Sequence, residues 1–437
     1  MVQRSAAAAH TPSMLKAIYT TTRAEAGCLA QSLREVEAHY RLEKQKRQAL
    51  HNSLVCLRLW RCVQQLGVGV TVRSWPGCFP ETVLVRCDRP GQPSVNRTYS
   101  FERVYGPAET QEAIFADVCP LLTSLLDGYN VCVMAYGQTG GGKSYTMLGP
   151  RSVAGATLPL AGCRAPGVIP RAAEELFRLI SEAPAGSTEV DVSVVEVYNN
   201  DIFDLLAKGG PAGVPGVKRE LVTTKEGRKE VSLLTSQVVG SAAELVRLVH
   251  GGLRLRVSHP TLVHADSSRS HLVVTVTVTT AASATGPDLQ SSAGLPQGFG
   301  CSPLPPAAVP LMQAKLQLVD LAGSECIGLS GVTGLALRET SFINRSLAAL
   351  ADVLGALAER RGHVPYRNSK LTHLLQDSIG GDAKLLVILC VSPSRRCMAE
   401  TLQGLSFGTR ARQVERGARR KRPPYSQAKA WAGQAGR

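Results

Sequence analysis

The chain has 437 residues, of which 44% are apolar and 19% are charged, and its formal net charge is +15. This composition excludes an intrinsically disordered chain, and the length suits one large domain or two ordinary ones. The twelve cysteines are scattered and form no C-x-x-C pair, which argues against a zinc site or a disulfide framework and indicates reduced thiols in the cytosol or nucleus.

The N-terminal region consists of residues 1–22, which have no helical pattern, followed by residues 23–58, which do. Residues 1–22 have no uninterrupted apolar core, and no run of about 18 apolar residues occurs anywhere, so we expect an intracellular protein with no membrane span and a disordered start. Residues 23–58 predict a coiled-coil neck helix. A single amphipathic helix stays an alternative, because Glu43 and Arg47 fall in the seam. Apolar seam residues spaced four, three, four are Leu29, Leu33, Val36 and Tyr40.

The next segment is the least regular part of the chain. Residues 68–72 and 82–85 have the composition of strands between Gly and Pro turns. From Tyr99 the pattern predicts a strand, a turn at Gly106-Pro107 and a helix that ends near Leu125.

A glycine-rich loop then follows a short apolar strand, 131–136. Its sequence, GQTGGGKS, fits the pattern G-x-x-x-x-G-K-[ST], in which backbone N–H groups surround phosphate oxygens. Lys143 is expected to reach the terminal phosphates and Ser144 to bind Mg²⁺, while Tyr145 can stack on a base. The nucleotide-binding candidates are Gly137, Gln138, Thr139, Gly140, Gly141, Gly142, Lys143, Ser144 and Tyr145.

Strands and helices keep alternating after the loop. A Gly/Pro/Ala-rich stretch, 149–167, interrupts one helix, and 190–198 predicts a strand followed by a short helix. Ser241 and Glu244 form a capping box at the start of another helix. This order predicts an α/β core with helices on both faces of a central sheet.

Two further segments carry candidate chemistry. DSSRSH, at 266–271, gathers hydroxyl groups and a guanidinium just before a strand, so Ser267 and Ser268 can orient water and bind metal. DLAGSE, at 320–325, follows the strand 315–319; Asp320 can hold the Mg²⁺ shell and Gly323 can sense a γ-phosphate. Between them, 281–312 is expected to be a disordered loop because it is rich in Gly, Pro and Ser.

These motifs, in this order, resemble the kinesin motor family between about Tyr99 and Val414. YGQTGGGKSYTM is similar to its phosphate loop, DSSRSH to its first switch and DLAGSE to its second. The resemblance implies a kinesin-type P-loop NTPase: a central, mostly parallel sheet flanked by helices over 59–414, with ATP and Mg²⁺ as cofactors. It also implies catalytic roles for Ser267, Ser268, Arg269, Asp320, Gly323 and Glu325, with Arg269 and Glu325 paired as a latch, and Mg²⁺ held by Ser144, Ser268 and, through water, Asp320.

The resemblance also implies the partner. FINRSLAAL and YRNSKLTHLLQDS are similar to the family's microtubule-facing segments, where the candidates are Arg338, Arg345, Arg367, Lys370 and His373. A heptad stretch ahead of the motor resembles the kinesin-14 class, which implies minus-end-directed movement, a homodimer and a role at the spindle pole or centrosome. Asn344 is implied as a relay to the long helix, and the basic residues 415–437 are expected to be a disordered tail.

Two other functions stay open. His264 replaces the family's usual Asn at the head of the first switch, and the family's adenine-holding R-x-R-P motif is missing near the first strand, so a nucleotide-gated microtubule scaffold with little hydrolysis is the main alternative. The net charge of +15 also fits an ATPase acting on nucleic acid. The chain lacks a basic and aromatic stretch for base stacking, which makes nucleic acid the weaker alternative.

Overall fold

The structure, a computed structural model, divides the chain into two units, Met1–Leu54 and Val55–Arg437. The described residues are 27, 30–32, 34–36, 58–62, 70–73, 81–87, 95–106, 109–150, 165–182, 187–208, 216–224, 229–256, 269–281, 311–325, 335–380, 383–392, 394 and 397–414.

In the first unit the described residues are helical. Gln31 Nε2 donates to Glu35 Oε1 at 3.3 Å, and Arg34 Nε donates to the Ala30 carbonyl at 3.1 Å. These bonds between residues four apart agree with the predicted helix. Arg58, the last residue of the predicted helix, instead begins a strand, and residues 37–57 lie outside the described residues. Pairing of two such helices stays a prediction.

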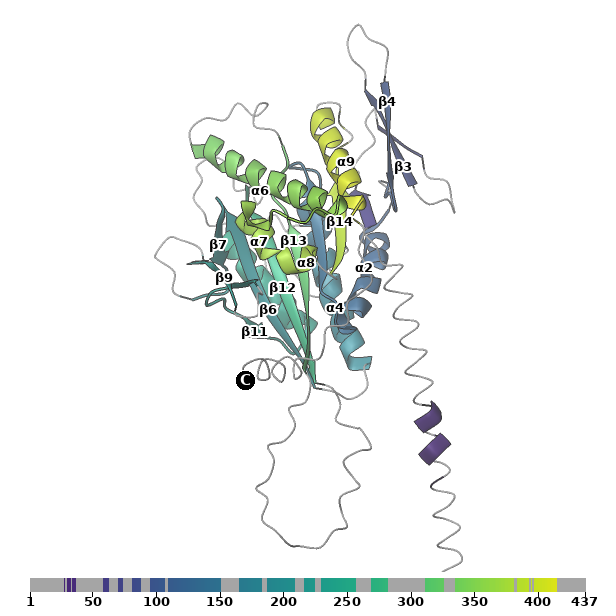
Figure 1. Ribbon diagram of the computed structural model, residues 1–437, viewed down its shortest axis with the longest axis vertical. Coiled ribbons are helices and arrows are strands. Elements are labelled where there is room, and N and C mark those ends of the chain that lie inside the picture. Colours follow the sequence, from purple (N-terminus) through teal and green to yellow (C-terminus); the bar gives the residue numbers. More distant parts are fainter. Residues whose placement is uncertain are drawn as a thin grey trace, which may run out of the picture. The chain divides into compact units, whose positions relative to one another are not determined.

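A nine-stranded sheet forms the centre of the second unit (Figure 1). The strands lie in the order β1 (Arg58–Cys62), β14 (Lys384–Cys390), β5 (Val131–Gly137), β13 (Leu311–Asp320), β12 (His271–Ala281), β6 (Thr188–Tyr198), β7 (Asp201–Asp204) and β8 (Val217–Arg219), and β11 (Gln237–Val238) also pairs with β6. Two small sheets are formed by β10 (Lys229–Val231) with β9 (Leu221–Thr223), and by β2 (Val70–Arg73), β3 (Glu81–Cys87) and β4 (Val95–Phe101).

The sheet is mixed, which corrects the expectation of a mostly parallel sheet. Only β1, β14, β5 and β13 run parallel, and every described pairing from β13 to β8 is antiparallel. The two long strands β12 and β13 pair from Leu272 opposite Asp320 to Ala281 opposite Leu311. The predicted loop at 281–312 is therefore shorter at both ends; 282–310 lie outside the described residues.

Helices cover both faces of the sheet, as the alternation predicted. One face packs on α2 (Gln111–Leu126), α3 (Lys143–Leu148), α4 (Val168–Glu182) and α5 (Ala242–Arg256); the other packs on α6 (Leu335–Ala358), α7 (Lys370–Leu374), α8 (Gln376–Ile379) and α9 (Met398–Arg412). Strand β5 is buried throughout, because successive side chains enter opposite cores. Val131, Val133 and Ala135 join the α2–α5 core, and Cys132, Met134 and Tyr136 join the α6–α9 core.

A tight hairpin replaces one predicted helix. Residues 201–204, expected to be helical, form β7 antiparallel to β6. Asn199 and Asn200, at the turn, have φ values of +50° and +62°. Two consecutive positive φ values are typical of a type I′ turn, which asparagine tolerates and which continues the twist of a hairpin. The prediction of a helix was wrong because it overlooked the Asn199-Asn200 pair as a turn signal.

Other local predictions are confirmed. Ser241 Oγ accepts from Glu244 N at 3.3 Å, and the Glu244 carboxylate accepts from Gly240 N at 2.8 Å, one residue before the usual capping-box partner. The stretch 149–167 separates two helices, as predicted, since α3 ends at Leu148 and α4 begins at Val168. Its two end residues lie close together: a Cβ added to Gly167 would be 2.5 Å from Gly149 N.

Among the described helices, α6 contains one stretch, Leu337–Ala358, that is long and apolar enough to cross a membrane. Leu350, Val353 and Leu354 of this stretch are fully buried in the α6–α9 core. The apolar character of α6 therefore reflects its packing on the sheet.

The hairpin makes a direct prediction at Asn199. We expect Asn199→Ala to lower the free energy of unfolding by about 1 kcal/mol, because alanine resists a left-handed backbone, and Asn199→Gly to change it by less than about 0.5 kcal/mol. Urea unfolding measures both variants. A helical segment would give the reverse order, with alanine more stable than glycine.

Candidate functional site

The phosphate-loop candidate lies at the edge where three parallel strands end. β5 ends at Gly137, β13 at Asp320 and β14 at Cys390. Gly137, Gly140 and Gly142 have φ values of +151°, +74° and +97°, and a Cβ on Gly137 would lie 1.9 Å from the Cys390 carbonyl oxygen. The turn therefore requires glycine both for its backbone conformation and for its contact with β14.

Lys143 is a buried cation inside this loop. Its side chain is 6% exposed, and Nζ donates to the Gln138 carbonyl at 2.8 Å. Burial lowers the pKa of Lys143, and the nearby Asp320 carboxylate opposes this shift. A buried ammonium group is costly without anionic partners, so this position favours a bound anion such as a phosphate.

Ser144 and Asp320 join the loop to the DLAGSE segment. Ser144 Oγ donates to Asp320 Oδ2 at 2.6 Å, although the two residues are 176 positions apart. Asp320 is fully buried, and its Oδ1 has no hydrogen-bond partner among the described residues. A hydroxyl and an unpartnered carboxylate oxygen are hard oxygen ligands, so this pair fits a Mg²⁺ ion with its bound waters.

Arg256, at the end of α5, is a site residue that sequence reasoning missed. Its side chain is 2% exposed and lies 3.4 Å from Asp320 Oδ2 and 3.6 Å from Glu196 Oε1. It also donates to Ser270, from Nε to Oγ at 3.0 Å and from Nη2 to the carbonyl at 2.7 Å. The guanidinium therefore holds the start of β12 beside Asp320 and neutralises charge there. No motif marks it, because its partners lie on three other elements.

Glu325 is bound to the phosphate loop. Its carboxylate accepts from Thr139 N at 2.9 Å and from Thr139 Oγ1 at 2.7 Å. A Cβ added to Gly323 would lie 2.1 Å from Glu325 Oε2 and 2.3 Å from Thr139 Oγ1. Gly323 is thus the residue that leaves room for the Thr139–Glu325 contact.

The predicted pair of Arg269 and Glu325 is not formed in this structure. Arg269 Nη1 instead lies 2.6 Å from Glu339 Oε2 on α6, and Tyr198 OH donates to the other oxygen of Glu339. Burial, together with this bond, raises the pKa of Tyr198 to about 12. Each member of the predicted latch therefore has another partner, and sequence reasoning missed both Glu339 and Tyr198.

Other candidates remain as predicted or lie outside the described residues. Ser267, Ser268 and His264 fall in the undescribed stretch 257–268, so their roles stay predictions. Tyr145 is half-buried, and its carbonyl accepts from Gln111 Nε2 at 2.7 Å.

The predicted partner-facing residues divide into two groups. Arg338, Arg345 and Arg367 are exposed, and the first two are seven residues apart on α6, which puts them on one face. Lys370 is half-buried; its Nζ pairs with Glu220 and its N–H donates to Asn200 Oδ1 at 2.9 Å. His373 is also half-buried. The three arginines are therefore the cations most available to a partner.

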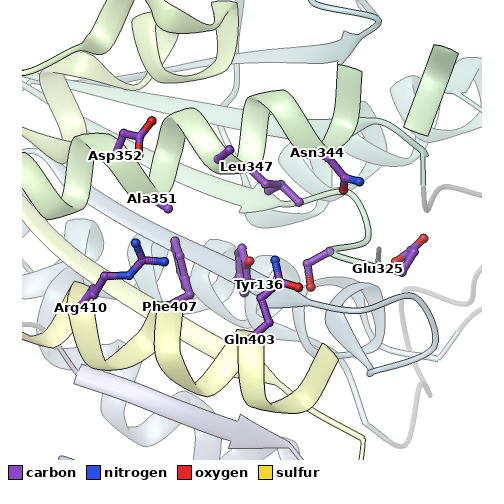
Figure 2. A pocket seen from close by; sticks show the side chains of 11 residues that line it. Tyr136, Glu325, Asn344, Leu347, Ala351, Asp352, Gln403, Phe407 and Arg410 are labelled. Atoms are coloured by element: carbon purple, nitrogen blue, oxygen red, sulfur yellow. The ribbon is translucent and has the colours of Figure 1, made fainter. Parts of the chain in front are cut away.

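A cavity of about 330 Å³ separates α6 from α9 beside Glu325 (Figure 2). The rings of Tyr136 and Phe407 stack there, with centroids 3.9 Å apart and planes at 10°. Glu325 and Asn344 line the same cavity. Because a cavity lies between α6 and α9, the two helices share fewer side-chain contacts there than closely packed helices would. A shift of α6 would therefore break fewer contacts.

Comparison with known proteins agrees with the geometry. Residues 81–414 match the family described as "Kinesin motor domain". The chain is 62% identical to "Kinesin-like protein KIF25" of Macaca fascicularis, covering 91% of this chain and 75% of that protein, and 40% identical to "Kinesin-like protein KIN-14E" of Oryza sativa subsp. japonica, covering 75% and 27%. A solved structure, "C-terminal motor and motor homology domain of Kar3Vik1 fused to a synthetic heterodimeric coiled coil", aligns with a TM-score of 0.66 at 27% identity, covering 91% of this chain and 99% of that one.

The space around Gly323 makes one prediction. Gly323→Ala should displace the Glu325 carboxylate, break both bonds to Thr139 and lower the free energy of unfolding by about 1–2 kcal/mol. Gly355→Ala is the matched control: nothing lies within 4 Å of a Cβ there, and its position inside α6 should favour alanine by about 0.5–1 kcal/mol. Urea unfolding should therefore give opposite signs; equal effects would contradict the tight contact.

His271 makes a second prediction. Burial, followed by the charges of Arg256 and Lys143, lowers the pKa of this histidine to about 3. The pKa of histidine in the unfolded chain is about 6.5, so between pH 3 and pH 6.5 the unfolded chain binds a proton that the folded chain does not. The free energy of unfolding therefore decreases as the pH falls below 6.5, and at pH 5 it is about 2 kcal/mol lower than at pH 7.5.

The check on His271 is unfolding in urea at pH 7.5 and pH 5. His271→Gln cannot titrate, so we expect its loss between the two pH values to be smaller than that of the parent chain by the same amount, about 2 kcal/mol. Equal losses in the two proteins would show that the folded ring is not held neutral.

Proposed function

Because the chain belongs to the kinesin motor family, we propose that it is an ATP-dependent microtubule motor that hydrolyses ATP at the Gly137–Ser144 loop. The kinesin motor domain is an ATPase, and kinesin motors bind microtubules. The observation that carries the proposal is the contact of Ser144 with Asp320, at 2.6 Å, beside the buried Lys143. It gathers a hydroxyl, a carboxylate and a cation where the backbone N–H groups of the loop converge.

The site residues divide the work of phosphate transfer. The loop N–H groups and Lys143 hold the phosphates. Ser144 and Ser268, with Asp320 through water, would hold Mg²⁺, which would neutralise phosphate charge. Ser267 and Ser268 orient the attacking water, and Gly323 senses the γ-phosphate. Arg256 holds Asp320 in place through its contact at 3.4 Å.

The two switch contacts support a change of state. Arg269 forms an ion pair with Glu339, and the Glu325 carboxylate accepts a hydrogen bond from Thr139. For Arg269 and Glu325 to pair as a latch, both residues must leave these partners. The pairing therefore releases α6 from Arg269 while it frees Thr139, which links the state of the phosphate loop to the partner-facing helix.

The microtubule surface in this proposal is the exposed basic side of α6 and the segment after it. Arg338, Arg345 and Arg367 contact acidic tubulin, with Lys370 and His373 at the edge. The net charge of +15 supports electrostatic steering toward such a surface.

Finer features follow from the relatives. The similarity to "Kinesin-like protein KIN-14E" agrees with the kinesin-14 class. The resemblance of the chain to that class supports minus-end-directed movement, with a role in spindle or centrosome organisation. The heptad pattern over 23–58 supports a homodimer. A nucleotide-gated scaffold is the second candidate, since His264 stands where the family has Asn and changes the charge and geometry at the first switch.

The test is ATP turnover by the purified chain with and without taxol-stabilised microtubules. We expect strong stimulation that Gly323→Ala abolishes, and gliding of polarity-marked microtubules with their plus ends leading, as immobilised minus-end-directed motors produce. Microtubule binding without stimulated turnover would support the scaffold instead.

The binding surface has its own test. We expect Arg338→Ala with Arg345→Ala to raise the microtubule concentration for half-maximal stimulation by roughly tenfold, since two exposed ion pairs contribute up to about 1 kcal/mol each. Basal turnover should not change. Arg247→Ala on α5, also an exposed arginine, is the matched control and should change neither value. Equal effects of the two changes would place the binding surface elsewhere.

A further inference from the structure

One buried imidazole ring joins three parts of the motor. His271 is the first residue of β12 and is 3% exposed. Its Nδ1 accepts from the Ala322 N–H at 3.1 Å, and its Nε2 lies 2.7 Å from Ser346 Oγ on α6. Arg269 and Ser270 of the first switch precede it directly, and Gly323 of the second switch follows Ala322.

The partners determine where each proton lies. The backbone nitrogen of Ala322 can only donate, so Nδ1 of His271 must accept and Nε2 must carry the hydrogen of the neutral ring. That hydrogen is donated to Ser346 Oγ, which in turn donates to the Ile343 carbonyl at 2.7 Å. The chain of bonds thus runs in one direction, from the backbone of the second switch to the backbone of α6.

The surroundings keep the ring in this state. Arg256 and Lys143 lie near enough to disfavour a positive charge on it, and burial excludes water as a substitute partner. A rigid ring with both nitrogens engaged has no free torsion that moves one bond without the other. A shift of Ala322 therefore displaces the turn of α6 that contains Ser346, next to the exposed Arg345.

We propose that His271 is a positioning residue that transmits movement of the second switch to α6 through Ser346. The inference rests on the proposed motor function and gives it a physical connection: Gly323 reports on the γ-phosphate, His271 carries the displacement, and α6 presents Arg338 and Arg345 to the microtubule. The contacts of Arg269 and Glu325 change partner, whereas the His271 bonds remain and move.

Three variants test the two hydrogen bonds of His271 separately. In His271→Asn the side-chain oxygen lies near the position of Nδ1, so the bond from Ala322 can persist while the bond to Ser346 is lost. In His271→Gln the amide nitrogen lies near the position of Nε2, so the reverse applies. Ser346→Ala removes the α6 bond and leaves the ring in place. The double variant His271→Asn with Ser346→Ala should be no worse than either single variant, because both changes remove the same bond.

The primary measurement is hydrogen exchange of the full chain in ADP and in a non-hydrolysable ATP analogue. In the parent chain we expect the two nucleotides to give different protection both at residues 321–325 and at residues 341–350. His271→Asn and Ser346→Ala should keep the first difference and lose the second. A merely structural role would lower protection equally in both nucleotide states and leave the difference intact.

Turnover provides the second measurement. We expect each variant to reduce the ratio of microtubule-stimulated to basal turnover by roughly five- to tenfold, with basal turnover of Ser346→Ala unchanged. A parent chain without stimulation would refute the motor function, while the exchange experiment would still decide the role of His271. Nucleotide-dependent protection of α6 that survives in all three variants, or is absent from the parent chain, would overturn the inference.

Discussion

The contact between Ser144 and Asp320 is the constraint on which the site depends. A fully buried carboxylate is tolerated only when hydroxyls and cations surround it, and here Ser144, Arg256 and Lys143 do so. The sheet makes this possible, because β5 and β13 are parallel neighbours and their carboxyl ends lie at one edge. The antiparallel strand β12 starts at that same edge, with Leu272 opposite Asp320. One sheet order therefore brings the phosphate loop and both switch segments together.

The long helix α6 connects this edge to the exterior of the molecule. Its buried face includes Glu339 and Ser346, which contact Arg269 and His271 of the first switch region. Its exposed face carries Arg338 and Arg345. Between α6 and α9 lies the cavity lined by Glu325 and Asn344 (Figure 2). A helix bonded to the switches on one side, and adjoined by a cavity on another, can move as a unit with a small loss of packing.

Much of the fold was readable from local pattern. The apolar run of β5, the alternation of β6 and the helix α2 were all predicted near their observed bounds. The error at 201–204 arose because a short amphipathic segment fits either period, and the turn signal lay in Asn199 and Asn200. The mixed sheet was not foreseen, because strand direction depends on long connections, and the run of residues between β12 and β13 has no signal for an antiparallel return.

The sequence by itself determined the chemistry of the site. The spacing of GQTGGGKS, DSSRSH and DLAGSE was enough to name Lys143, Ser144 and Asp320, because each role depends on residue type within a few positions. Only the tertiary structure decided which polar side chains pair with one another. Arg256 forms an ion pair with Asp320 and Arg269 with Glu339, while Thr139 is hydrogen-bonded to Glu325 and Ser346 to His271. These pairs are separated by 64 to 186 positions, and no local spacing encodes them. They arise because burial leaves each polar group only the neighbours that the packed sheet and helices supply.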